Sequence, residues 1–196
     1  LKKNIPEFAG KLRIGIPRVL NMYEDFPFWF TFFNQLGCEV VLSDYTTKDQ
    51  YNKAIDTIPS DTACYPAKAV HGHIRDLSKA QVDLIWYPCI QHGPKEFSRD
   101  NNYHCPMVIS YPELIRNNMQ DVMGKTPFYA PFLPLADKKS LVPALVKALK
   151  DLPFSKSEIS NAVETAWAEQ EKCKADYREM TKKTVSRLVA EQVPTI

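Results

Sequence analysis

Residues 12–42 read LRIGIPRVLNMYEDFPFWFTFFNQLGCEVVL, and this stretch decides the fold. The apolar run 12–16 is stopped by a proline, which is typical of a buried strand. The aromatic segment 25–36 is too apolar for an exposed helix, so we expect a helix that packs on a sheet and ends at Gly37. The apolar run 38–42 predicts a second strand, joined to the first by a right-handed crossover.

Strands and helices continue to alternate along the chain. Patterns typical of helices cover 47–55, 64–79 and 137–150, and patterns typical of strands cover 83–87, 106–110 and a short edge piece within 128–133. This alternation predicts an α/β fold with a doubly wound parallel sheet of the Rossmann or flavodoxin-like type. We expect the strand order 2-1-3-4, with the edge piece as a fifth strand.

The pattern changes near residue 150. Residues 1–150 predict one Rossmann-like α/β domain. Over 151–196, apolar residues recur among charged ones at helical spacing, which predicts a long amphipathic extension made of one helix or a helical pair. The chain starts with a leucine and stops directly after a helical pattern, so we expect a fragment of a larger protein whose other domains are its partners.

Composition argues against several classes of function. The net charge is +2, and basic and acidic residues are mixed along the chain, so no nucleic-acid footprint is visible. No apolar run reaches the ~18 residues of a membrane span, and a secretory signal is missing, so we expect a cytoplasmic protein without nucleic-acid or membrane partners. Five cysteines are an odd set for a disulfide scaffold, which favours a thiol, metal or cluster role. We expect Cys38 and Cys173 to be packing residues.

Two cysteines are expected at the carboxyl ends of the strands, where doubly wound sheets bind ligands. Cys64 opens the helix that leads into the third strand, and a helix start favours a thiolate. Lys68 and His71, four and seven residues later, share its helix face and would add positive charge. Cys89 follows the third strand directly. Two buried structural thiols would give the same pattern, because free cysteine is often buried.

The place of Cys105 is ambiguous. It precedes the predicted strand 106–110, and a parallel strand starts at the opposite edge of the sheet, about 17 Å away. Cys105 can join Cys64 and Cys89 only if the loop 91–104 carries it to their edge, or if the strand begins later. The four histidines show no zinc spacing, and no four-ligand zinc motif is visible.

Further polar residues are candidates for ligand binding at the same edge. Arg18, Asn21 and Tyr23 follow the first strand, where the sequence lacks a glycine-rich phosphate loop. They could bind an anionic or polar ligand, or they could simply be polar loop residues. Tyr111 and Glu113 follow the fourth predicted strand, and Glu113 could equally be a capping residue favoured by the helix dipole.

Several motifs together resemble a known family. They are Ile14-Gly15-Ile16-Pro17-Arg18-Val19-Leu20, Pro27-Phe28-Trp29, Cys64-Tyr65-Pro66-Ala67-Lys68, His71-Gly72-His73, Tyr87-Pro88-Cys89, Cys105-Pro106 and Ser110-Tyr111-Pro112-Glu113. Between about residues 12 and 135, the chain resembles the domain of unknown function found in large bacterial CoA-substrate-specific enzyme activases. These proteins are related to the activator and dehydratase components of 2-hydroxyacyl-CoA dehydratases and benzoyl-CoA reductases.

The resemblance implies a Rossmann-like half of a dehydratase-type subunit that holds an iron–sulfur cluster, of the 4Fe-4S type, through cysteines. In the relatives one ligand lies at a helix start and another follows the next strand, and these positions match Cys64 and Cys89. The motif around Cys105 adds it as a third metal ligand. A further ligand comes from a later domain, and the activases' ATP-binding motifs are absent from this sequence. The chain would therefore be one domain of a multidomain reductase or dehydratase component, inactive alone.

Two functions remain open from the sequence. The first is an iron–sulfur redox domain acting on a CoA thioester, with one concave site at the strands' carboxyl ends. We expect that site to be lined by Arg18, Asn21, Cys64, Lys68, Cys89, Tyr111 and Glu113. The second is a non-redox module that binds CoA or a partner domain and uses its cysteines structurally. A structural zinc site is disfavoured.

Overall fold

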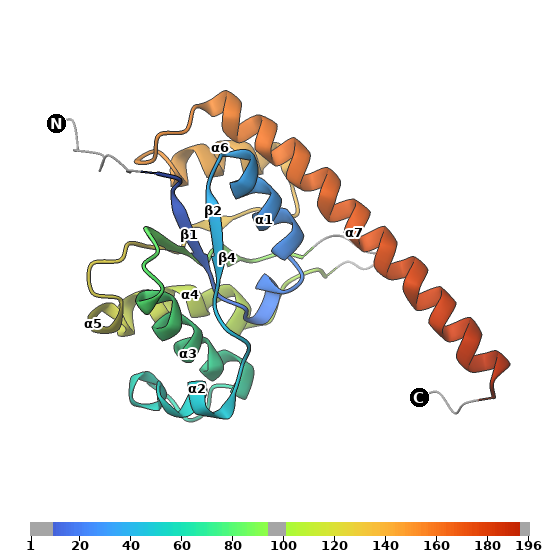
Figure 1. Cartoon of the computed structure of the whole chain (residues 1–196), viewed down its shortest axis with the longest axis horizontal. Helices are drawn as coiled ribbons and strands as arrows, with labels where there is room; N and C mark the ends of the chain where they lie inside the picture. The colour runs from blue at the N-terminus through green and yellow to red at the C-terminus, as the bar shows by residue number, and fades with distance from the viewer. Residues whose placement is uncertain (1–9, 94–100, 193–196) are drawn as a thin grey trace.

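A computed structural model describes residues 10–93 and 101–192 of the chain (Figure 1). Its central sheet is parallel and has the strand order β2-β1-β3-β5. The four strands are β1 (Arg13–Ile16), β2 (Glu39–Leu42), β3 (Leu84–Trp86) and β5 (Phe128–Tyr129). Two more strands, β4 (Cys89–Ile90) and β6 (Phe132–Leu133), pair with each other in parallel. The predicted α/β fold with a parallel, doubly wound sheet is confirmed.

The short β4–β6 pair continues the ladder between β3 and β5. The backbone N–H of Tyr87 donates to the carbonyl of Tyr129, and that of Cys89 donates to the carbonyl of Pro131, each over 2.9 Å. Pro88 has no N–H to give, so it interrupts the pairing without ending it. Cys89 therefore follows β3 as the first residue of the strand β4.

Helices cover both faces of the sheet (Figure 1). They are α1 (Phe26–Gln35), α2 (Lys48–Asn52), α3 (Tyr65–Lys79), α4 (Pro106–Asn118), α5 (Gln120–Met123), α6 (Lys138–Ala148) and α7 (Lys156–Ala190), with 3-10 turns η1 (Leu20–Met22) and η2 (Ile55–Thr57). Helices α1, α6 and α7 pack together, and α3, α4 and α5 form the other group. The chain passes from β1 to β2 in one direction and from β2 to β3 in the other, so right-handed crossovers place α1 and α3 on opposite faces.

The aromatic helix α1 forms the centre of the core, as its sequence predicts. Its Trp29 and Phe33 rings are fully buried and pack against Trp86 of β3, with ring centroids 5.2 and 5.3 Å apart. Gly37 follows the helix with a φ of 77°, a left-handed conformation that glycine adopts without strain. The unit β1–α1–β2 therefore forms where residues 12–42 predict it.

Residues 106–110 form the first turns of α4, so the predicted fourth strand is wrong. Pro106 occupies the first helical turn, where its missing N–H costs nothing, and the Ser110 hydroxyl donates to the Pro106 carbonyl over 2.8 Å. Short apolar runs do not separate strands from buried helix turns, and here packing of α4 on β4 decides. The fourth place in the sheet is taken by β5, part of the predicted edge piece 128–133.

The predicted C-terminal extension is one helix, α7, of 35 residues. It starts at a capping box, in which the Ser155 hydroxyl accepts from the N–H of Glu158 and the Glu158 carboxylate accepts from the N–H of Ser155. The first half of α7 packs on α1 and α6, and its second half extends past the body of the protein (Figure 1). Among the described residues, none of the helices combines the length and the apolar character needed to cross a membrane. A domain boundary at residue 150 stays a prediction.

Candidate functional site

Helices α3 and α4 both begin at the carboxyl edge of the sheet. At the amino end of β1, the guanidinium of Arg13 donates to the carbonyls of Ala80 and Gln81, which directly follow α3. Helix α3 thus ends at the amino edge and begins at the carboxyl edge. Helix α4 follows β4 along the chain and leads back to β5, so it runs in the same direction as α3, with which it is in contact. Their N-terminal cap residues are Cys64 and Cys105.

Cys64 and Cys105 have similar local structure. Both have extended backbones and exposed side chains, and both are followed by a proline in the first helical turn. Neither thiol caps its helix through a hydrogen bond, so each remains available for other chemistry. The strand-direction argument that placed Cys105 at the opposite edge is wrong, because it rested on a strand that is a helix.

Cys89 has a different environment. Its side chain is fully buried, and its thiol donates to the carbonyl of Ala130 over 3.9 Å. Burial raises the pKa of Cys89 to about 12; the Glu113 carboxylate also raises this pKa, and the Glu113 backbone N–H lowers it. Glu113 lies eight residues into α4, about 12 Å of helix rise from Cys105. The Cys89 thiol therefore packs between β4 and α4, well below the helix start.

A hydrogen-bond chain links α3 and α4 beside Cys64. The Thr57 hydroxyl donates to the carbonyl of Ala54 over 2.7 Å, so its oxygen accepts from Nδ1 of His71, 2.8 Å away. This leaves Nε2 of His71 as an acceptor for the Tyr111 hydroxyl, 3.2 Å away. Burial, followed by the charge of nearby Cys64, raises the pKa of Tyr111 to about 12. The Tyr111 hydroxyl is thus fixed as a donor to His71.

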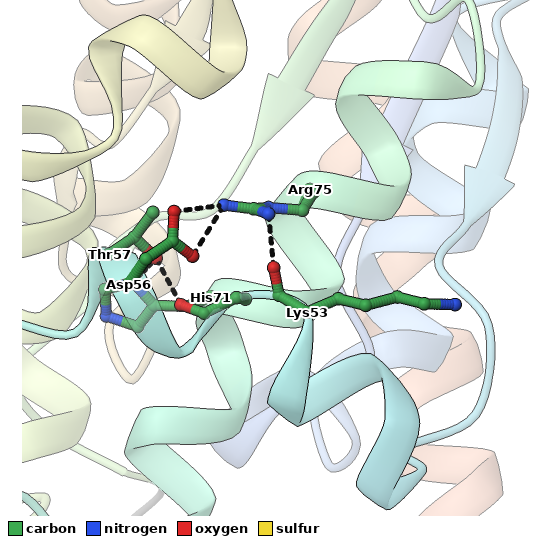
Figure 2. Close-up of polar contacts among 6 residues, drawn as sticks. Lys53, Asp56, Thr57, His71 and Arg75 are labelled. Atoms are coloured by element: carbon green, nitrogen blue, oxygen red, sulfur yellow. Dashed lines mark hydrogen bonds and ion pairs between the residues drawn. The ribbon is translucent and has the colours of Figure 1, made fainter.

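An ion pair between Arg75 and Asp56 of η2 lies beside this hydrogen-bond chain. The Arg75 guanidinium donates to both carboxylate oxygens of Asp56, over 3.0 and 3.1 Å, and to the carbonyl of Lys53 (Figure 2). Burial and the neighbouring Arg75 charge lower the pKa of His71 to about 4. His71 is therefore neutral at pH 7 and adds no positive charge beside Cys64, contrary to the expectation from its helical spacing.

Arg18 joins the carboxyl ends of β1 and β2. Its backbone N–H donates to the Ser43 hydroxyl, and its Nε donates to the Ser43 carbonyl, over 2.9 and 2.8 Å. Its guanidinium lies over the ring of Tyr45, 4.3 Å from the centroid. Ser43 also bonds Nδ1 of the buried His73, whose Nε2 bonds the Thr46 hydroxyl. The loops after β1 and β2 are thus tied to α3 at one place.

The remaining predicted residues lie near the helix starts or in the loop after β1. Asn21 is buried and donates from its amide to the Asp25 carboxylate over 2.9 Å, while its Oδ1 has no hydrogen-bond partner in the described part of the chain. Tyr23 is exposed, and Lys68 donates to the carbonyl of Asp61 over 3.4 Å. That all the predicted residues surround one concave site stays a prediction.

The donor set fits a metal cluster only in part. Within residues 10–93 and 101–192, no three histidine, cysteine, aspartate or glutamate side chains converge as a metal-binding group. Cys64 and Cys105 fit the chemistry of cluster ligands, because they are exposed thiols at helix starts. Cys89 does not fit in this side-chain arrangement, because its thiol is buried and bonded to the backbone.

Sequence reasoning missed how the two motif histidines are used. Their rings are buried and bonded on both nitrogens, His71 between η2 and α4 and His73 to the loop after β2. Between them, a Cβ on Gly72 would lie 2.8 Å from the backbone oxygen of Gln50, so only glycine allows α2 to approach α3 this closely. The motif His71-Gly72-His73 was the visible signal, and its partners Thr57 and Ser43 lie too far away in sequence to be inferred.

Comparison with known families decides where the chain belongs. The family model described as the CoA enzyme activase uncharacterised domain matches residues 13–196. The chain belongs to this family. The match confirms the resemblance seen in the motifs up to residue 135, and it extends the CoA enzyme activase domain through α7. No curated protein and no solved structure matches the chain.

Proposed function

We propose that this CoA enzyme activase domain binds an iron–sulfur cluster as one part of a redox protein that acts on CoA thioesters. The observation that carries the proposal is the pair of exposed thiols, Cys64 and Cys105, at the starts of two neighbouring helices on one sheet edge. Thiolates are the usual protein ligands of iron–sulfur clusters. Family membership supports the link to CoA.

Each residue at this edge has a separate role in the proposal. Cys64 and Cys105 hold the cluster, which supplies low-potential electron transfer when it is bound. Tyr111, held by His71, positions α4 against α3 and so sets the spacing of the two helix starts. Cys89 would join the ligands only by turning its thiol out of the interface between β4 and α4. The Arg18 guanidinium offers a fixed cation for an anionic group such as a CoA phosphate.

A specific observation favours a second candidate, a non-redox module that binds CoA or a partner domain. Cys89 is a buried thiol with a raised pKa, as expected of a structural cysteine. In addition, no three ligating side chains converge within the described ranges. In this alternative, Arg18 would serve the ligand and the cysteines would have no redox role.

Anaerobic reconstitution with iron and sulfide separates the two candidates. The protein is desalted after reconstitution, and bound iron and visible absorption are measured. We expect the wild type to bind iron, and Cys64→Ser and Cys105→Ser to lose most of it. Cys173→Ser is the matched control, because Cys173 lies on α7 and should not affect binding. Iron retained by Cys89→Ser would show that the buried thiol is not a ligand.

The outcome against the redox candidate is equally clear. If the Cys64→Ser and Cys105→Ser variants bind as much iron as Cys173→Ser, the bound iron is not held by these two thiols at the carboxyl edge of the sheet. If the wild type binds no iron but binds CoA, and Arg18→Ala weakens that binding, the non-redox module is the correct function.

A further inference from the structure

The half-buried guanidinium of Arg18 is fixed at the carboxyl ends of β1 and β2, but its charge is not paired there. Its Nε donates to the Ser43 carbonyl over 2.8 Å, and its plane lies over one face of the Tyr45 ring, 4.3 Å from the centroid. Within residues 10–93 and 101–192, no carboxylate lies within ion-pair distance of Arg18, and no protein group accepts from its Nη1 or Nη2. The two Nη groups therefore form an unpaired fork, which is the arrangement that binds a phosphate through two parallel hydrogen bonds.

Tyr45 offers a stacking surface beside this cation. Its side chain is 71% exposed, and Arg18 covers one face of the ring, so the exposed surface includes the other face. An aromatic face binds nucleobases by stacking, which needs no hydrogen bond to the base. A stacking face next to a phosphate-binding fork is therefore suited to a nucleotide.

The sheet topology places Arg18 where α/β folds bind ligands. β2 and β3 lie on opposite sides of β1, so the strand order reverses beside β1. In open parallel sheets, ligands bind outside the carboxyl ends of the strands at such a reversal. Arg18 follows β1 in a segment without a glycine-rich loop, so its side chain supplies the phosphate contact that backbone N–H groups would otherwise make.

Buried side chains beneath Arg18 hold it in place and set its distance from the cysteines. Its backbone N–H donates to the Ser43 hydroxyl over 2.9 Å, and this hydroxyl bonds Nδ1 of the buried His73 over 2.7 Å. A cation that is already ordered loses little conformational freedom when it binds an anion. Along α3, about 14 Å of helix rise separates His73 from Cys64. Arg18 is therefore bonded to the third turn of α3, well away from the first turn, where Cys64 lies.

We propose that Arg18 and Tyr45 bind the phosphorylated adenosine end of CoA. This inference rests on the proposed function, in which the domain acts on a CoA thioester, and it assigns one end of CoA to a defined place. The adenine stacks on the open face of Tyr45, and a phosphate accepts from the Nη groups of Arg18. The pantetheine arm separates these phosphates from the thioester, so the thioester can reach the starts of α3 and α4 while Arg18 holds the other end.

Isothermal titration calorimetry on the full chain tests the proposal with CoA, adenosine 3′,5′-bisphosphate and pantetheine. We expect CoA and the bisphosphate to bind, and pantetheine, which lacks the nucleotide, not to bind measurably. Arg18→Ala and Tyr45→Ala should each raise the dissociation constant of CoA about tenfold, because each removes one of the two contacts. Tyr45→Phe keeps the ring and should bind as the wild type does. Arg187→Ala and Tyr177→Ala are matched controls, because they remove the same residue types from exposed positions on α7.

The possible outcomes separate this inference from the proposed function. CoA binding that Arg18→Ala and Tyr45→Ala leave unchanged would overturn the inference alone, because CoA would then bind elsewhere on the domain. Binding of the bisphosphate without CoA, or pantetheine binding as tightly as the bisphosphate, would also overturn it. A wild type that binds no CoA would overturn both the inference and the link to CoA. Iron content after reconstitution tests cluster binding separately, and we expect Arg18→Ala to retain as much iron as the wild type.

Discussion

The Tyr111 hydroxyl of α4 donates to Nε2 of the fully buried His71 on α3 across 3.2 Å. This contact joins the two helices whose first residues follow Cys64 and Cys105. Because Nδ1 of His71 is already bonded to Thr57, Tyr111 satisfies the last polar atom of the ring. Helices α3 and α4 are therefore joined through a neutral, fully bonded histidine.

Replacing Tyr111 with phenylalanine should destabilise the protein. The change leaves Nε2 of His71 buried without a donor, which costs about 1–3 kcal/mol of unfolding free energy. Urea unfolding at pH 7 measures the difference. Tyr177→Phe is the control, because the Tyr177 side chain is exposed and its change should be neutral. Equal stability of Tyr111→Phe and wild type would show that the hydrogen bond does not contribute.

Stability should fall as the pH is lowered from about 6.5 toward 4. Burial lowers the pKa values of His71 and His73 to about 4, so in this window the unfolded chain binds more protons than the folded one. Burial raises the pKa of Asp25 to about 6, so the folded chain binds this proton more readily than the unfolded chain does. The contribution of Asp25 to folding stability therefore grows as the pH falls through this value. Asp25→Asn should therefore steepen the loss, and His73→Asn should reduce it. Urea unfolding at pH 7 and pH 5 measures the change in unfolding free energy for each variant. If this change equals that of the wild type in both variants, the shifted pKa values of His73 and Asp25 are not its cause.

The five cysteines should differ in reactivity toward a thiol reagent under native conditions. Cys64 and Cys105 are exposed and should react first, whereas burial raises the pKa of Cys38 and of Cys89 to about 12 each and should make them slow. Stopped-flow absorbance with a chromogenic disulfide measures how many thiols react in the fast phase and how many react in the slow phase. Cys64→Ser and Cys105→Ser should each remove one fast equivalent. A fast phase that is lost in Cys89→Ser would show that the buried thiol opens readily.

Gly72→Ala should destabilise the protein although alanine normally favours helices. The new Cβ would lie 2.8 Å from both the Cγ and the carbonyl oxygen of Gln50, so α2 must move away from α3. Overpacking of this kind costs about 1–3 kcal/mol, which exceeds the helix-propensity gain of about 1 kcal/mol. Gly10→Ala is the control, because no atom lies within 4 Å of its added Cβ. Urea unfolding measures both variants; a stabilised Gly72→Ala would contradict the close approach.

The part of the fold that local sequence could predict is the unit β1–α1–β2 and the long helix α7. Trp29 and Phe33 lie on the core face of a helix that Gly37 ends, so pattern and cap agree. The prediction of a strand at 106–110 is wrong because a short apolar run between prolines has no periodicity that would distinguish a strand from a helix. Packing of α4 on β4, which is a long-range contact, decided its structure.

The candidate site could be predicted only where it depends on a single element. Cys64 follows from its place at the start of α3, a local signal. The edge at which Cys105 lies depends on whether the segment after it is a strand or a helix. Because residues 106–110 were predicted as a strand, Cys105 was predicted at the wrong edge of the sheet. The burial of Cys89 depends on pairing of β4 with β6 across a proline break, which no local pattern announces.

The most direct measurement of cluster binding is an anomalous difference map at the iron absorption edge, from crystals of the anaerobically reconstituted protein. Iron held as proposed gives a peak in contact with the sulfur atoms of both Cys64 and Cys105, at the starts of α3 and α4. A map with no iron peak at these two sulfurs, from crystals whose protein retains iron, would contradict the proposed site.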